Sequence, residues 1–473
     1  MQSSTHPRPI GWRVRPRDQR TILLISDLLV GYIALAVALF IWGLRDQWFS
    51  TFFSERVNDN PWFYFMPLVW IVFLAEMYDP HRAKNTRRTI IGIALAALAA
   101  LICYALLYLL SPKGSLPRWG VGVFLTFAAI FTLIWRLIYI RIFTGQAFLR
   151  RVLVVGAGKA GITFVQACGD IHPQPFTIIG FIDDDPRKVG RKIEGFPVLA
   201  DSKALLGVIQ KEAVSDLVIA ITGEMHGGTF QSIIDAQERD VEVIPMPTLY
   251  EELLGRVPIH HLDSEWLIRS FVDEARVNGF YEIEKRLIDI LIALAGLILY
   301  LVLYPFIAIV ILLDSGFPIV YKQIRSGKGG KPYTFYKFRS MRQDAEKNGN
   351  VQVTHENDER ITRTGGFLRR THIDELPQAW NVLRGEMSII GPRAERPELI
   401  EKYQKEIPFY RARLLVKPGI TGWAQVNYGY SATIAENTEK LEYDLYYIKH
   451  RNLFMDISVI LRTVGQVIGF RGR

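Results

Sequence analysis

The sequence predicts a membrane protein that joins an α-helical bundle to α/β domains, and three observations lead to this fold class. Apolar residues make up 49% of the 473 residues and the mean hydropathy is positive, so part of the chain lies in lipid. Several apolar stretches have about the 20 residues that a membrane-spanning helix needs. A glycine-rich turn follows an apolar run at residues 152–161, which is typical of a parallel α/β sheet.

The formal charge of +9 narrows the class of partner. It suits a protein that works beside an anionic membrane face on phosphorylated substrates. Nucleic acid is not expected as a partner, because the arginines are spread among glycine turns and membrane flanks rather than along one recognition helix. The only two cysteines, Cys103 and Cys168, exclude a disulfide framework and a cysteine zinc cluster.

Four apolar stretches predict four transmembrane helices within residues 22–145. Arginines crowd the N-terminus (1–21) and the loop after the second stretch, whereas the first and third loops hold few basic residues. The positive-inside rule therefore predicts that the N-terminus and everything after the fourth helix are cytoplasmic. Asp27 is costly in lipid and is expected either to be functional or to lie at headgroup level. The stretches are residues 22–44, 62–78, 90–110 and 119–140, of which the second is the shortest.

Residues 146–260 predict a Rossmann-like cytoplasmic domain, and residues 261–281 a linker after it. Gly156, Gly158 and Gly161 form a turn between a strand and a helix, and Asp183 follows the second strand. Such a turn holds nucleotide phosphates at a helix N-terminus. Two interpretations stay open: a weak cofactor site made by these four residues, or a fold that is kept for packing or association.

A fifth apolar segment, residues 282–316, predicts a re-entrant membrane helix. The stretch between Asp289 and Asp314 carries no charge and is long enough to cross a membrane. Basic residues lie both before and after the segment, so a crossing would put one of the two groups on the wrong face. Pro305 supplies a break where the helix can kink and return. A fifth true span is the alternative.

Asp374 and Glu375, followed by Pro377, mark a helix N-terminus in a small α/β domain at residues 317–473. Proline is tolerated in a helix mainly in the first turn, where free backbone N–H groups and the helix dipole favour an anionic ligand. The two carboxylates therefore indicate a phosphate-handling site. The alternative is that Asp374 only caps the helix.

Other motifs accompany this acidic pair in a fixed order. They are Tyr321-Lys-Gln-Ile-Arg-Ser-Gly, Phe335-Tyr-Lys-Phe-Arg-Ser-Met341, Thr364-Gly-Gly-Phe-Leu-Arg-Arg370, Ser388-Ile-Ile-Gly-Pro-Arg-Ala-Glu-Arg-Pro397 and Lys417-Pro-Gly-Ile-Thr-Gly-Trp-Ala-Gln425. Over roughly residues 280–473 the chain resembles the large, multi-spanning polyprenyl-phosphate sugar-1-phosphate transferases of bacterial polysaccharide synthesis. The resemblance implies that the re-entrant helix carries the catalytic domain and that the Rossmann-like domain is accessory.

The resemblance also implies roles for individual residues. Asp374 is the expected nucleophile, which forms an aspartyl-phosphosugar intermediate, and Glu375 is expected to bind Mg²⁺, the implied cofactor. Lys337 and Arg339 are the other catalytic candidates. Ala394 stands where family members often have proline, which leaves the nucleotide end of the site in question. The candidates for binding phosphate are Arg369, Arg370, Arg393 and Glu395.

The implied function is transfer of a hexose 1-phosphate from a UDP-sugar to undecaprenyl phosphate at the bacterial inner membrane. UMP leaves, and the lipid-linked sugar begins an exopolysaccharide or capsule repeat unit. A homo-oligomer is compatible with the sequence. One alternative is a membrane-tethered NAD-dependent nucleotide-sugar oxidoreductase or epimerase, but the spaced pair Tyr333 and Lys337 lies in a strand-like run rather than on a helix. The other alternative is a non-catalytic assembly subunit.

Overall fold

The computed structural model describes residues 16–46, 61–78, 86–110, 118–143, 150–169, 171, 174, 176–262, 279–342, 358–429 and 433–468. The chain forms two compact units, Met1–Leu249 and Tyr250–Arg473. The second unit therefore begins before residue 260, where the sequence analysis ends the Rossmann-like domain. Most of the linker expected at 261–281 lies outside the described residues.

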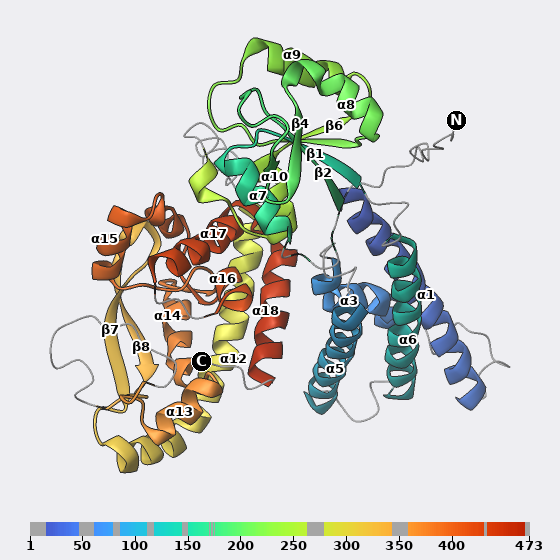
Figure 1. Ribbon diagram of the computed structural model, residues 1–473. Coiled ribbons are helices and arrows are strands. Elements are labelled where there is room, and N and C mark those ends of the chain that lie inside the picture. Colours follow the sequence, from blue (N-terminus) through green and yellow to red (C-terminus); the bar gives the residue numbers. More distant parts are fainter. Residues whose placement is uncertain are drawn as a thin grey trace. The chain divides into compact units, whose positions relative to one another are not determined.

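Four helices among the described residues are long and apolar enough to cross a membrane (Figure 1). Three belong to the first unit and match the first, third and fourth predicted spans: α1 (Pro16–Asp46), α5 (Thr86–Leu110) and α6 (Arg118–Phe143). The fourth is α12 (Gly279–Ser315) of the second unit, the predicted re-entrant segment. The length and apolar composition of these helices identify the chain as a membrane protein.

The second predicted span is not one long helix. Its residues form η2 (Pro61–Phe65), α3 (Met66–Phe73) and η3 (Ala75–Tyr78), a run too short to count among the four. Pro67 lies in the first turn of α3, where its missing N–H costs nothing. Trp70 of α3 is buried, and its Nε1 donates a hydrogen bond to Thr132 Oγ1 at 3.1 Å. This segment is therefore anchored to α6.

Asp27 forms a buried ion pair in this bundle. Its Oδ2 lies 2.6 Å from Arg136 Nη2 of α6, and both side chains are almost fully buried. Arg136 Nη1 also donates to the Met77 carbonyl at 3.0 Å. Since a charge in lipid is stabilised by an opposite charge and by backbone carbonyls, this pair explains how α1 tolerates Asp27. The pair joins α1, η3 and α6.

The α/β domain of the first unit is built on one six-stranded sheet with the order β3-β4-β2-β1-β5-β6. Every pair is parallel except β3 with β4. The strands are β1 (Arg150–Val155), β2 (Phe176–Ile182), β3 (Lys192–Ile193), β4 (Phe196–Ala200), β5 (Asp216–Ile219) and β6 (Glu242–Pro245), and the helices are α7 (Lys159–Gly169), α8 (Leu205–Glu212), α9 (Gly227–Gln237) and α10 (Met246–Leu254), with a short η5 (Ser202–Ala204).

The second unit is a small α/β domain that packs along α12. Its sheets have two strands each: β7 (Val320–Ser326) with β8 (Pro332–Phe338) antiparallel, and β9 (Ser388–Ile390) with β10 (Gly419–Thr421) parallel. The other elements are η6 (Ile259–His261), η8 (Lys328–Gly330), α13 (Arg363–Arg370), η9 (Ile373–Gln378), α14 (Ala379–Arg384), α15 (Pro397–Glu406), η10 (Tyr410–Leu415), α16 (Trp423–Asn427), α17 (Ile434–His450) and α18 (Leu453–Ile468).

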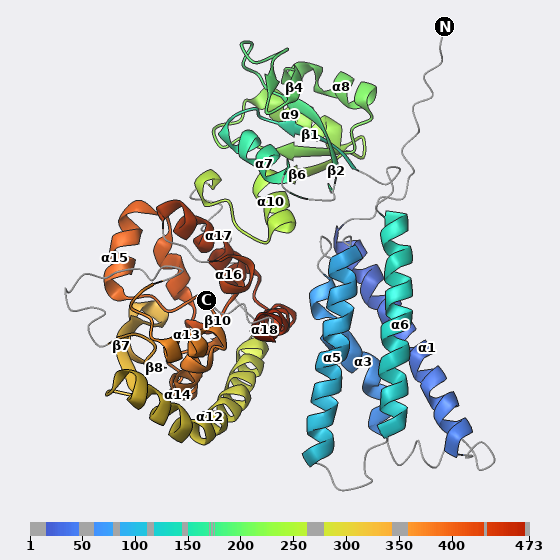
Figure 2. The same cartoon turned by 60° about the horizontal axis from the view of Figure 1, so that its bottom comes forward.

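Helix α12 is continuous through Pro305, so the predicted break is not a break in the helix. Figures 1 and 2 show instead that α12 bends along its length. Proline lacks the N–H for the i→i−4 hydrogen bond, which is a standard cause of a bend. Ala293 before the proline is buried in the core of the unit, and Ile311 after it is buried against Phe338 and Leu368. Both halves of α12 therefore pack on the same domain.

The start of α12 is fixed to that domain by three charged residues. Lys285 Nζ lies 3.0 Å from Asp456 Oδ2 of α18. Arg286 donates to the Val382 and Leu383 carbonyls at 2.8 and 2.9 Å. Asp289 accepts hydrogen bonds from Ser388 Oγ and from the Ile389 N–H at 2.9 and 2.8 Å. The Lys-Arg-x-x-Asp sequence therefore joins α12 to α14, α18 and β9.

Helix α18 has one buried face and one face with exposed apolar side chains. Asp456, Val459 and Arg462 are buried on one face, whereas Phe454 and Val464 are exposed. The buried face packs on the core that also contains α12 and α17. This helix is consequently part of the second unit's core and keeps some apolar side chains on the surface.

Candidate functional site

Asp374 and Glu375 lie in the first turn of η9, between α13 and α14. The prediction of a helix start is confirmed, although the turn is a short 3₁₀ helix that contains Pro377. The N-cap is His372, whose φ is +55° and whose side chain makes no capping hydrogen bond. Asp374 is thus not the cap of this helix.

Lys337 connects β8 to both acids. Its Nζ lies 2.6 Å from Asp374 Oδ2 and 3.8 Å from Glu375 Oε1. Asp374 is 1% exposed, so its carboxylate is taken from water and placed beside one ammonium group. A buried carboxylate keeps its charge only with such a partner. Lys337, predicted as catalytic, is therefore brought directly to the acidic pair.

The two neighbouring carboxyls have opposite pKa shifts. Burial raises the pKa of Asp374, although Lys337 opposes this effect. Burial also acts on Glu375, but Lys337, Arg393, His372 and Arg369 together outweigh it and lower its pKa. Adjacent acids with separated pKa values are typical of sites in which the two groups have different tasks.

Arg369 and Arg370 are adjacent in the sequence, but their side chains have different surroundings. Arg369 is half-buried, and burial lowers the pKa of its guanidinium, although the carboxyls of Asp374, Asp358 and Glu375 oppose this shift. Arg370 is exposed, and its Nε donates back to the Gly366 carbonyl of its own helix. Arg369 therefore belongs to the acidic site, whereas the described contacts of Arg370 lie elsewhere.

Arg393 reaches the site from the turn after β9. Its Nη1 lies 3.8 Å from Glu375 Oε1, and 46% of its side chain is exposed. An exposed guanidinium beside a buried acid can exchange water for the phosphate oxygens of a substrate. The phosphate-binding role of Arg393 stays a prediction.

Arg339 lies at the far end of α12. Its Nη2 donates to Ser315 Oγ at 3.0 Å and to the Gly316 carbonyl, and the residue is 5% exposed. None of its described hydrogen bonds or ion pairs joins it to Asp374 or Glu375. The two basic residues of the Lys337-Phe-Arg339 motif thus make different contacts. Lys337 lies at the acidic pair, whereas Arg339 binds the end of α12.

Glu395 belongs to a buried ion cluster. Its Oε1 lies 3.5 Å from Lys440 Nζ and 3.6 Å from Arg413 Nη1. Although burial opposes ionisation, these cations lower the pKa of Glu395 to about 2. Arg413 also donates to Asp444 at 2.8 Å and to the Arg393 carbonyl at 3.3 Å. Arg413, paired with Glu395, therefore holds the backbone of the turn that carries Arg393.

Sequence reasoning missed Arg413 and Lys440, because neither lies in a motif with a recognisable spacing. Ala394, which replaces the family's usual proline, is buried, and its carbonyl accepts a hydrogen bond from Arg325 Nη1 at 3.0 Å. Its backbone is thus held by that arginine. Trp423, which the motif Gly419-Ile-Thr-Gly-Trp contains, donates to the Gly255 carbonyl at 2.8 Å and packs under Arg462.

Tyr333 and Lys337 do not form an oxidoreductase pair. Both lie on β8, where Tyr333 is buried and Lys337 is engaged with Asp374. Of the weak cofactor residues, Gly156, Gly158 and Asp183 line one pocket of the α/β domain, whereas Gly161 packs behind the turn. Within the described ranges, no group of three or more His, Cys, Asp or Glu side chains could hold a metal ion.

Comparison with known proteins identifies two family models in the chain. The model described as "Bacterial sugar transferase" matches residues 280–470, and the model described as "CoA-binding domain" matches residues 74–226. The first therefore covers α12 except for its first residue, Gly279, together with the acidic site.

Three relatives illustrate the similarity. A UDP-N-acetylgalactosamine-undecaprenyl-phosphate N-acetylgalactosaminephosphotransferase of Aeromonas hydrophila is 40% identical over 49% of this chain and 54% of its own. A UDP-glucose:undecaprenyl-phosphate glucose-1-phosphate transferase of Xanthomonas campestris pv. campestris is 33% identical over 59% and 58%. The exopolysaccharide production protein PSS of Rhizobium leguminosarum bv. phaseoli is 40% identical over 38% of this chain and 92% of its own. The chain thus spans little more than half the length of the first two.

Proposed function

Since the chain belongs to the bacterial sugar transferase family, we propose that it transfers a hexose 1-phosphate from a UDP-sugar to undecaprenyl phosphate and releases UMP. The observation that carries this proposal is Asp374, a buried carboxylate held 2.6 Å from Lys337, with Arg369 near it and Arg393 beside the neighbouring Glu375. Relatives whose names specify UDP-glucose and UDP-N-acetylgalactosamine support a UDP-sugar donor.

The arrangement suits a two-step phosphoryl transfer. An Asp374 oxygen attacks the phosphorus that bears the sugar, the bond from this phosphorus to the oxygen shared with the second phosphate breaks, and UMP leaves with that oxygen. An oxygen of the lipid phosphate then attacks the same phosphorus and releases Asp374. Arg393 and Arg369 hold the negative oxygens during both steps, because phosphoryl transfer depends on positioning and charge neutralisation.

We propose Glu375 as a ligand of Mg²⁺. Its pKa is lowered, so it stays ionised, and a hard cation takes carboxylate oxygens together with phosphate oxygens. Magnesium usually binds through one or two carboxylates plus substrate phosphates, which suits a site with two acids. When bound, the ion supplies positive charge where the nucleotide departs.

We further propose that α12 is re-entrant and that the catalytic domain lies on the cytoplasmic face of the inner membrane. Residues on both sides of Pro305 pack on one domain, while Leu291, Ile298 and Phe306 expose apolar side chains. A crossing would draw that polar domain into the bilayer. The bend thus allows α12 to dip into one leaflet and to keep Asp374 near the lipid phosphate.

We also propose that the α/β domain is of the Rossmann type. The central position of β1, the glycine turn that follows it and the parallel neighbours β2 and β5 support this assignment.

The test of the transferase proposal is UMP release by detergent-solubilised protein from a panel of UDP-sugars, with Mg²⁺ and undecaprenyl phosphate. We expect release with at least one donor and a loss on the order of 10³-fold or more in Asp374→Asn, because the nucleophile is removed. Chelation of Mg²⁺ with EDTA should stop release and added Mg²⁺ restore it. Glu398→Gln, an exposed acid on α15, is the matched control and should keep full activity. Equal activity in Asp374→Asn and the unchanged protein would refute the proposal.

A further inference from the structure

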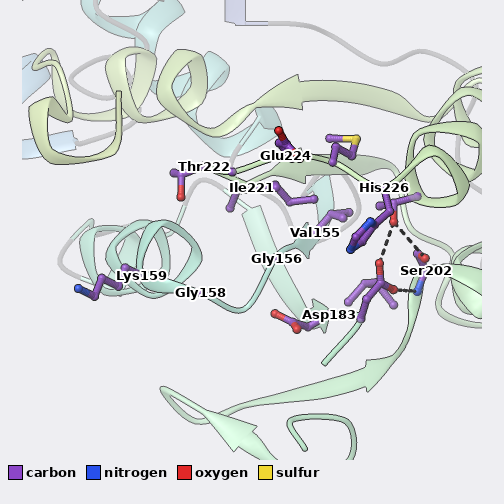
Figure 3. A pocket seen from close by; sticks show the side chains of 16 residues that line it. Val155, Gly156, Gly158, Lys159, Asp183, Ser202, Ile221, Thr222, Glu224 and His226 are labelled. Carbon is purple, nitrogen blue, oxygen red and sulfur yellow. Dashed lines mark hydrogen bonds between the residues drawn. The ribbon is translucent and has the colours of Figure 1, made fainter. Parts of the chain in front are cut away.

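A pocket of about 280 Å³ lies in the α/β domain, at the carboxyl ends of β1, β2 and β5 (Figure 3). The strand order places β1 at the centre, with β2 and β5 on either side of it. In open parallel sheets this is the point where chain connections leave in opposite directions and where ligands bind. The acidic site of the second unit has no residue in this lining.

The three glycines of the turn have different reasons to be glycine. A Cβ on Gly156 would lie 2.9 Å from the Ala220 carbonyl oxygen, and one on Gly161 would lie 2.1 Å from the Gly156 carbonyl oxygen. The fold itself thus requires these two. A Cβ on Gly158 would meet nothing within 4 Å, and its φ lies outside the left-handed region, so the fold would accept another residue at this position. Gly158 lines the pocket, so its missing side chain leaves space for a ligand.

Two helices begin at this pocket. The Ile162 N–H donates to the Gly158 carbonyl at 3.0 Å, which makes Gly158 the N-cap of α7. The N-cap of α9 is His226, whose side chain makes no capping hydrogen bond. Both N-caps line the pocket, and Lys159 lines it as well. The first N–H groups of a helix lack partners within it, so this end of the pocket favours a phosphate.

Asp183 lines the pocket beside the glycine turn, and both of its carboxylate oxygens accept hydrogen bonds. Oδ2 accepts from the Ala157 N–H at 2.8 Å and from Lys188 Nζ at 2.9 Å, and Oδ1 accepts from the Asp185 N–H at 2.9 Å. Asp184 uses both oxygens inside the fold, on the Ser202 N–H and on Thr229 Oγ1, at 2.7 Å each. Glu224 lies across the pocket from Asp183 (Figure 3). Asp183 therefore holds the glycine turn, and because an ionised carboxylate has about four acceptor sites, it can still accept a hydrogen bond from a ligand hydroxyl group.

We propose that this pocket binds a nucleoside diphosphate with an unphosphorylated ribose, its diphosphate over Gly158 and its ribose hydroxyls donating to Asp183. The volume is near the lower end of the roughly 300–1,000 Å³ of small-molecule pockets, which favours one nucleotide over a whole dinucleotide. Asp183 repels a phosphate on the ribose. It also competes with a bare diphosphate for the Ala157 N–H. The site goes beyond the transferase reaction and stands independently of it.

The primary test is calorimetric titration of the full-length, detergent-solubilised protein with ADP. We expect saturable binding that weakens at least 10-fold in Gly158→Asp. Aspartate is a favourable N-cap, so α7 should be at least as stable in this variant, while the new carboxylate repels the diphosphate. Lys211→Ala is the matched control, because it lowers the net charge by the same amount at an exposed position of α8 outside the pocket. It should bind ADP like the unchanged protein.

Further ligands test the role of Asp183. CoA, which carries a phosphate on its ribose, and inorganic pyrophosphate should each bind at least 10-fold more weakly than ADP. Asp183→Asn keeps an acceptor for the Ala157 N–H but removes the negative charge. The difference in affinity between ADP and CoA should therefore be smaller in this variant. Pyrophosphate binding as tight as that of ADP, or ADP binding unchanged in Gly158→Asp, overturns the proposal.

UDP needs a separate comparison, because it is also part of the proposed donor. UDP binding that Gly158→Asp abolishes and Arg393→Ala retains supports the pocket. UDP binding that Arg393→Ala abolishes and Gly158→Asp retains belongs to the acidic site, and together with the absence of ADP binding it overturns the pocket proposal while leaving the transferase proposal intact.

Discussion

At the scale of single residues, the candidate site depends on one short contact. Asp374 and Glu375 are neighbours in the chain, yet Lys337 lies 2.6 Å from the first and 3.8 Å from the second. Burial raises the pKa of Asp374, and Lys337 is the largest opposing influence. Lys337 is therefore the residue that favours the ionised form of Asp374, the proposed nucleophile.

Replacing Lys337 should move the pH dependence of the reaction. In Lys337→Gln, burial acts on Asp374 without its main counter-charge, so the pKa rises further and the acid limb of the kcat profile moves to higher pH. The measurement is UMP release between pH 5 and 9. Lys322→Gln, an exposed lysine of the neighbouring strand β7, should leave the acid limb in place. Lower activity with an unmoved acid limb would mean that Lys337 acts on the substrate rather than on Asp374.

At the scale of elements, α17 carries a buried carboxyl with an unusual titration. Burial raises the pKa of Glu442 to about 7, despite Arg256, whose Nε lies 3.6 Å from Oε2. Between the ordinary value of 4.5 and about 7, the folded chain holds a proton that the unfolded chain has released. Stability is therefore highest at the acidic end of this window and falls as pH rises.

This titration predicts that the free energy of unfolding falls as pH rises, and that replacing Glu442 removes this dependence. From pH 4.5 to 7, Glu442 lowers the free energy of unfolding by on the order of 3 kcal/mol, and Glu442→Gln should flatten the dependence. Thermal melts in detergent across this range measure the change. Glu401→Gln, an exposed acid of α15, should retain the slope of the unchanged protein. Equal slopes in all three proteins would show that Glu442 is ionised in the folded state.

The charged start of α12 is a second feature at this scale. Asp289 accepts two hydrogen bonds from β9, one of them from the Ile389 backbone N–H. A buried N–H left without an acceptor costs about 1–3 kcal/mol. The residue thus holds the helix to the sheet that precedes the Arg393 turn.

Asp289→Ala should destabilise the protein without touching the reacting groups. We expect Tm to fall by roughly 4–8 °C for a loss of about 2 kcal/mol. Differential scanning fluorimetry of the solubilised protein measures it. Glu284→Ala, an exposed acid on the same helix, should melt like the unchanged protein. An unchanged Tm in Asp289→Ala would contradict the anchoring role of these hydrogen bonds.

At the scale of the whole molecule, the side of the membrane on which the second unit lies depends on whether α12 crosses the bilayer or returns to the same face. The helix has 37 residues, which is more than a crossing requires. Its apolar outer face is exposed from Phe280 to Leu313, while its inner face packs on one domain. Length and composition alone describe a span, whereas the packing supports a return to the same face.

Cysteine labelling distinguishes these topologies. In a variant without Cys103 and Cys168, we place single cysteines at two exposed positions, Glu282 in the first turn of α12 and Lys322 on β7 after its end. A membrane-impermeant maleimide should label both in inverted inner-membrane vesicles and neither in intact spheroplasts, because a re-entrant helix has both ends on one side. Labelling of one position in each preparation would establish a fifth span.

The sequence by itself determined the elements whose pattern is local. The apolar lengths of α1, α5 and α6, the glycine turn after β1 and the acids at the start of η9 are all visible in short windows of the chain, because hydropathy and turn chemistry act over a few residues. The order of motifs around Asp374 and Glu375 also indicated the family. The second span was overestimated, since apolar content does not reveal that Pro67 restarts the helix.

Tertiary structure alone decided which charged side chains meet. Lys337 and Arg339 are two residues apart, yet one reaches Asp374 and the other the end of α12. Arg369 and Arg370 are adjacent, yet only the first acts on the acidic pair. Arg413 of η10 and Lys440 of α17 reach Glu395 from separate segments. Ion pairs depend on distances in space between residues far apart in the chain, and these distances exist only after the core has packed.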